Sequence, residues 1–203
     1  MFSIIDYTTK IQQILAQPLC LPGANQYLDL AQVTDFNKIP LKEKDNVLPE
    51  ADPIAEATFL IIQTMQACYL ALTKIGINEL LKAYLRLITS ENQEECTKVF
   101  SNYIFEIYLY SLKKDYPYTD LLWKYLSNCF HVISQYLLEE GYVEGCEIFL
   151  QDIASMGKLA AQKGLHTSSI QHFLHTLELR AKELNYNELA AVAKNHRFNL
   201  EIF

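Results

Sequence analysis

The sequence of 203 residues predicts an all-α protein, either an irregular antiparallel helical bundle or a short α-solenoid, with about seven or eight helices. Three observations predict this fold class. From residue 53 onward, apolar residues recur at steps of three and four, which places them on one face of a helix. Gly, Pro and Asn separate the periodic segments. The connections between these segments are short, so successive helices are expected to fold back on one another as antiparallel hairpins.

Three apolar stripes show the helical period most clearly, and each requires a neighbouring helix to cover it. They are Ile61, Met65, Cys68, Leu72 and Ile75; Val143, Cys146, Leu150, Ile153, Gly157 and Ala160; and Ile170, Leu174, Leu177, Ala181 and Leu184. Half of all residues are hydrophobic, so a sizeable core is expected.

The first 52 residues differ from the rest of the chain. Residues 4–17 predict a helix that Pro18 ends. Residues 18–52 are interrupted by prolines and by a charged, aperiodic stretch, so apart from a short helix at residues 25–33 we expect an irregular connection that is mobile or follows the surface. The sequence therefore divides into residues 1–52, an N-terminal helix with a proline-containing connecting segment, and residues 53–203, a helical domain.

The helical domain begins with a capping signal. Asp52 supplies an acceptor for free backbone N–H groups, and the fixed φ of Pro53 suits the first turn. We expect this helix to end at Gly76 and a shorter one to run from Asn78 to Thr89. The remaining expected helices are 91 or 92 to 114, 119–140 ended by Gly141, 143–163 ended by Gly164, 167 or 168 to 184 followed by Asn185, and 187–198. Within them, residues 130–154 with Gly141 at the turn resemble one tetratricopeptide hairpin, but helices of about 20 residues are too long for a repeat of about 34.

Charge and cysteine content restrict the function classes. The net charge is −7 and the basic residues are scattered, whereas a nucleic-acid interface needs a concentrated basic stripe. The five cysteines have no CxxC spacing and predict neither a disulfide framework nor a zinc site, which favours a reducing compartment. Since the N-terminus has no secretory signal pattern, we expect a cytoplasmic protein.

Residues 57–73 form an uncharged stretch of 17 residues, which raises the question of a membrane helix. Gln63 and Gln66 interrupt it, and Glu56 and Lys74 bound it. This composition favours a buried helix of a bundle over a membrane span.

The sequence predicts no catalytic residues and no cofactor. Cys129 and His131 are two apart, so on a helix they point about 200° away from each other and cannot form a local nucleophile–base pair. His172, His175 and Glu178 follow one another at steps of three, a spacing that can present metal ligands. Because the two histidines point away from the apolar stripe of their helix, we interpret them as surface residues and keep a metal site as the alternative.

Aromatic residues crowd into two neighbouring helices and the turn between them. The partner or ligand surface that we predict there consists of Tyr103, Tyr108, Tyr110, Trp123, Tyr125 and Tyr136. The alternative is a thick core with tyrosine hydroxyls at its rim. The sequence thus predicts a non-enzymatic protein-interaction or scaffold module that binds a protein partner or self-associates. The alternative function is a small-molecule or metal-binding bundle, including an enzyme, with an aromatic-lined pocket.

Overall fold

The computed structural model describes residues 3–19, 21, 30, 35–39, 41 and 52–201. In these residues it contains eight α-helices, one 3-10 helix and no strand, which confirms the all-α fold class. The elements are α1 (Ile4–Leu15), η3 (Phe36–Lys38), α2 (Pro53–Gln66), α3 (Leu70–Leu87), α4 (Gln93–Lys113), α5 (Thr119–Glu139), α6 (Val143–Gln162), α7 (Ser168–Glu183) and α8 (Asn187–Glu201).

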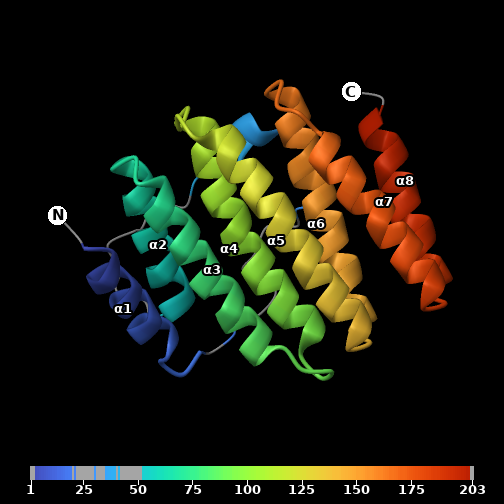
Figure 1. Ribbon diagram of the computed structural model, residues 1–203, viewed down its shortest axis with the longest axis horizontal. Coiled ribbons are helices and arrows are strands. Elements are labelled where there is room, and N and C mark those ends of the chain that lie inside the picture. Colours follow the sequence, from blue (N-terminus) through green and yellow to red (C-terminus); the bar gives the residue numbers. More distant parts are fainter. Residues whose placement is uncertain are drawn as a thin grey trace.

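The helices stack in two layers (Figure 1). One layer contains α1, α3, α5 and α7, and the other contains α2, α4, α6 and α8, because each helix packs on the next helix of the chain and on the next but one. Neighbours within a layer run parallel. On α4 and α6, for example, Gln93 contacts Gly145 and Ser101 contacts Asp152, so both contacts advance in the same direction. This arrangement is a short α-solenoid, one of the two architectures that the sequence predicts.

Five turns of the described chain share one construction. The residue after the helix C-cap has a positive φ, and the N–H of the following residue donates to the carbonyl five residues before it, as in a Schellman motif. The positive-φ residues are Cys68, Asp115, Gly141, Gly164 and Asn185, and the donors are Tyr69, Tyr116, Tyr142, Leu165 and Tyr186. The predicted ends of α5, α6 and α7 at Gly141, Gly164 and Asn185 are therefore confirmed.

The predicted helix end at Gly76 is wrong. The chain turns at Cys68, whose φ is 57°, and Gly76 lies inside α3. A Cβ at Gly76 would collide with the hydroxyl of Tyr7 on α1 and with Ile61 on α2. Glycine is therefore needed at this position for the close approach of three helices. The uncharged stretch of residues 57–73 spans the turn between α2 and α3, and no helix of the described residues is long and apolar enough to cross a membrane.

Two further segments bear on the prediction, the connection before the helical domain and the last helix. Residues 25–33, where the sequence predicts a short helix, lie outside the described residues except for Leu30. The side chains of Leu30, Phe36 and Ile39 are buried and belong to the same core cluster as the helices. Leu30, Phe36 and Ile39 of the connection are thus held in the core, whereas Asn37 and Lys38 are exposed at the surface. The last helix continues to Glu201, beyond the predicted end at residue 198.

Candidate functional site

Three of the six predicted surface aromatics lie in the core. Tyr103, Tyr108 and Trp123 are buried, so this part of the prediction needs correction. The rings of Tyr108 and Trp123 stack with centroids 5.0 Å apart, and Trp123 Nε1 donates to the carbonyl of His166 at 3.1 Å. The Tyr103 hydroxyl donates to Asp52 Oδ2 at 2.5 Å. These contacts join α4 to the N-cap of α2 and α5 to the turn before α7, and the three buried side chains offer no face to a partner.

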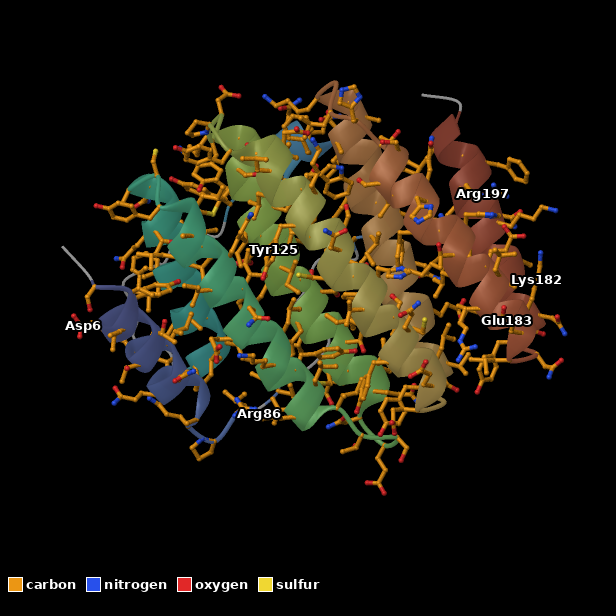
Figure 2. The ribbon with its side chains drawn as sticks, viewed as in Figure 1. Asp6, Arg86, Tyr125, Lys182, Glu183 and Arg197 are labelled. Atoms are coloured by element: carbon orange, nitrogen blue, oxygen red, sulfur yellow. The ribbon has the colours of Figure 1, made fainter. Side chains whose placement is uncertain are left out.

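The other three aromatics, Tyr110, Tyr125 and Tyr136, are partly exposed. The Tyr125 hydroxyl donates to the carbonyl of Lys74 at 3.1 Å, and Lys74 Nζ lies 5.3 Å from the centre of the Tyr125 ring. Tyr125 therefore lies at the junction of α3 and α5, in the middle of the layer (Figure 2). Burial raises the pKa of Tyr125 well above its usual range, so the phenol is neutral.

A stripe on α5 contains two of these tyrosines. We call Tyr125, Cys129, Val132 and Tyr136 the α5 stripe, because spacings of four, three and four place them on one helix face. Val132 is 63% exposed, and the other three are partly exposed. Cys129 and Val132 were not predicted as site residues, although the helical period between the two tyrosines could have identified them.

The α5 stripe has no nucleophilic chemistry. Burial raises the pKa of Cys129, so its thiol is protonated at neutral pH. His131 lies on another face of α5, where its ring contacts Phe173 of α7 at 6.3 Å between centroids. The stripe is therefore an apolar and aromatic surface with hydroxyl groups, suited to contact rather than to catalysis.

The predicted metal candidates occupy different environments on α7. His172 and His175 are exposed, whereas Glu178 is 4% exposed. The Glu178 carboxylate accepts from Lys182 Nζ at 2.5 Å and from Arg197 of α8 at 3.2 Å. The hydrogen bond from Lys182 and the nearby positive charges lower the pKa of Glu178. This carboxylate thus links α7 to α8, and within the described ranges no three His, Cys, Asp or Glu side chains are grouped to hold a metal ion.

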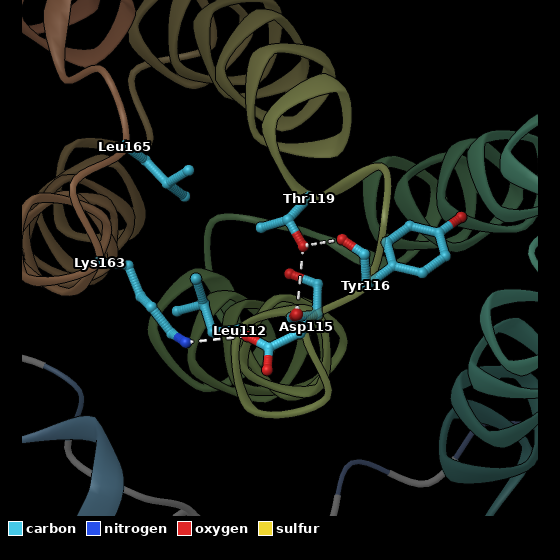
Figure 3. Close-up of a pocket in the computed structure, with 7 residues that line it drawn as sticks. Leu112, Asp115, Tyr116, Thr119, Lys163 and Leu165 are labelled. Atoms are coloured by element: carbon cyan, nitrogen blue, oxygen red, sulfur yellow. Dashed lines mark hydrogen bonds and ion pairs between the residues drawn. The ribbon is translucent and has the colours of Figure 1, made fainter.

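Two open hollows lie at turns between helices. One of about 320 Å³ lies where α4, α5 and the α6–α7 turn meet (Figure 3) and is lined by Ser111, Leu112, Asp115, Tyr116, Thr119, Lys163 and Leu165. Lys163 Nζ and Asp115 Oδ1 form an ion pair of 3.0 Å at its edge. The other, of about 370 Å³, is lined by Val143 and residues 185–189. None of the six predicted aromatics lines either hollow, so neither is the aromatic pocket of the alternative prediction.

No protein family, curated protein or solved structure matches this chain. Its candidate sites are therefore defined by their own geometry. Among them, the α5 stripe is the surface that retains part of the predicted aromatic site.

Proposed function

We propose that the protein is a non-enzymatic helical interaction or scaffold module of the cytoplasm, and that it binds a protein partner or a second copy of itself through the α5 stripe. The observation that carries this proposal is the stripe itself, with Val132 63% exposed between two partly exposed tyrosines on one helix face. Tyrosine is enriched at protein interfaces because its ring is apolar and its hydroxyl tolerates water.

The surroundings of the stripe resemble the polar rim of an interface. Lys124 and Asp120 form an exposed ion pair of 3.1 Å near its first turn. Arg180 of α7 pairs with Glu139 at 3.4 Å beyond its last turn. An apolar centre with charged ends allows burial of the stripe while these ion pairs stay in water. Covering Val132 alone would contribute about 1–2 kcal/mol of binding free energy.

The experiment compares two aspartate substitutions at exposed apolar positions. Val132→Asp places a charge in the α5 stripe, whereas Leu179→Asp places one on α7, where the side chain is 47% exposed and outside the stripe. Sedimentation velocity over a range of concentrations measures self-association, and affinity capture from the source cell with both variants measures partner binding. We expect Val132→Asp to weaken association at least about tenfold, because a buried charge costs more than the lost apolar contact, and Leu179→Asp to leave it intact. Equal association of the two folded variants would contradict the proposal.

The hollow of about 320 Å³ favours a second candidate function, the binding of a small polar molecule, because its volume lies in the range of ligand sites and its rim carries Lys163 and Asp115. Native mass spectrometry of protein purified from the source cell would test it. If this second function is correct, the unmodified protein carries a bound molecule. That molecule is absent from the Leu165→Trp variant, because the larger side chain narrows the hollow.

A further inference from the structure

The α5–α6 turn and the α7–α8 turn have the same construction. Each carries a positive-φ residue, a tyrosine, one further residue and a glutamate, as GYVE at residues 141–144 and NYNE at residues 185–188. In both turns the tyrosine N–H donates to the carbonyl five residues before it, and the tyrosine carbonyl accepts from the N–H four residues after it. A Cβ at Gly141 would lie 3.8 Å from the hydroxyl of Tyr186, so the two turns are in contact.

The hollow of about 370 Å³ lies at the junction of these two turns. It is lined by Val143 from the first turn and by residues 185–189 from the second. The polar groups of this lining are the Tyr186 hydroxyl, the Glu188 carboxylate and the amides of Asn185 and Asn187. Their oxygens all accept hydrogen bonds, and among the described residues no lysine, arginine or histidine lines the hollow. The lining therefore suits a ligand with several N–H donors. We call this site the tyrosine–glutamate hollow.

The end of the stack around the tyrosine–glutamate hollow is acidic. The turns that join α3 to α4, α5 to α6 and α7 to α8 all lie at this end, at the bottom of Figure 1. Their residues 90–95, 139–144 and 183–188 contain eight glutamates and no lysine, arginine or histidine, whereas the net charge of the whole chain is −7. The rest of the chain is therefore close to neutral on balance, and the excess negative charge lies at this end.

Ion pairs and helix dipoles explain only part of this charge. Arg180 pairs with Glu139 and Glu183. The glutamates in the first turns of α4, α6 and α8 are favoured by the positive ends of the helix dipoles. Glu140 has neither explanation, because it is the C-cap of α5 and forms no ion pair with a described residue. Positive ends of α6 and α8 and negative ends of α5 and α7 meet at the two turns, so the glutamates determine the sign of the local potential.

We propose that the tyrosine–glutamate hollow binds an arginine side chain from a basic segment of a protein partner. The planar guanidinium stacks on the Tyr186 ring and donates a pair of hydrogen bonds to the Glu188 carboxylate. Lysine fits less well, because its ammonium is a point charge without the planar fork of donors. Glu140 and Glu144 on the neighbouring turn are exposed and attract further basic residues of the same segment. The hollow is separate from the α5 stripe, and the inference does not depend on the function of that stripe.

The test measures peptide binding to the full chain by fluorescence anisotropy. The probe is a fluorescein-labelled peptide of alternating glycine and arginine, and the comparison peptide carries citrulline, which is uncharged and has nearly the same shape as arginine. We expect the arginine peptide to bind and the citrulline peptide to bind at least about tenfold more weakly, since hydrogen bonds between charged groups are stronger than neutral ones. Added salt should weaken binding of the arginine peptide.

Variants locate the binding site within the acidic end. Glu188→Gln keeps the shape of the hollow and removes its charge, so it should weaken binding of the arginine peptide at least about tenfold. Glu94→Gln is the matched control, because it removes the same charge from the first turn of α4, outside the hollow, and it should change binding little. Tyr186→Leu should weaken binding and Tyr186→Phe should retain it, since the second variant keeps the aromatic ring. Circular dichroism confirms that each variant is folded.

Three results would overturn the proposal. Equal weakening by Glu188→Gln and Glu94→Gln would show that the acidic end attracts basic peptides without a site in the hollow. Equal binding of the arginine and citrulline peptides would show that no guanidinium is recognised. Displacement of the probe by spermidine, a free polyamine, at a lower concentration than by unlabelled arginine peptide would assign the hollow to a small cation rather than to a protein partner.

Discussion

Replacement of Gly76 by alanine tests the close packing of α1, α2 and α3. A Cβ at this position would meet the hydroxyl of Tyr7, Cγ1 of Ile61 and Cδ1 of Ile11. All three side chains are fully buried, and protein interiors are close-packed. The substitution therefore forces the helices apart or the side chains into poorer rotamers.

Two opposing effects set the size of the change in stability. Alanine in place of glycine inside a helix adds about 1 kcal/mol of stability through helix propensity. Overpacking of a core costs about 1–3 kcal/mol, and contact with three buried side chains places Gly76→Ala in the upper part of that range. We expect a net loss of about 1–2 kcal/mol in the free energy of unfolding. For a chain of this size, the loss lowers Tm by about 2–8 °C.

Thermal and urea unfolding followed by circular dichroism measure this change. In a Tyr7→Phe background the hydroxyl is absent, so Gly76→Ala should cost about 0.5–1 kcal/mol less. If Gly76→Ala raised Tm instead, the gain in helix propensity would outweigh the overpacking. The close approach of α1 and α2 to Gly76 would then be refuted.

The other predictions concern turn geometry and pH. Cys68 has φ 57°, a conformation that glycine adopts without strain, so Cys68→Gly should raise the free energy of unfolding by about 0.5–1 kcal/mol. Gly141 has φ 76°, so Gly141→Ala should lower the free energy of unfolding. If urea unfolding gave changes of the same sign for both variants, the left-handed turns would be contradicted. Glu178→Gln should cost about 1–3 kcal/mol at neutral pH. The Glu178 pKa is lowered in the fold by Lys182, so its stabilisation is present above the unfolded pKa of about 4.3 and is lost as pH falls through the lower folded value. The Tm difference between Glu178→Gln and the unmodified chain should therefore disappear under strongly acidic conditions, and a pH-independent difference would contradict this role.

Helix ends are predictable where the turn residue favours the conformation of the turn. Gly141, Gly164 and Asn185 tolerate positive φ, and α5, α6 and α7 end beside them. Cys68 has no such tendency, so the apolar period continues across the turn and the sequence pattern places the break at Gly76 instead. A glycine that permits close packing and a glycine that ends a helix look alike in one sequence, because the difference lies in residues far along the chain such as Tyr7.

The candidate site is predictable only in part, for a similar reason. Periodicity shows which residues share a helix face, and the spacing of Tyr125 and Tyr136 puts them on the same face of α5. It does not show how many neighbours a helix has. Since α2, α3, α5 and α6 all pack on α4, Tyr108 is buried although its helix is aromatic most of the way round. Glu178 is buried beside the stripe of α7 because Arg197 of α8 provides a counter-charge that the local sequence does not reveal.

The two-layer stack is the central claim, and the aromatic contacts that join its layers test it most directly. The ring of Tyr84 on α3 lies 5.4 Å from Phe100 on α4 and 6.4 Å from Phe149 on α6, and Phe149 lies 5.1 Å from Phe130 on α5. An aromatic nuclear Overhauser spectrum of the protein, with these residues assigned, should show cross-peaks for all three ring pairs. If Phe149 has no cross-peak to either Tyr84 or Phe130, α6 does not pack between the layers as described, and the stack is wrong.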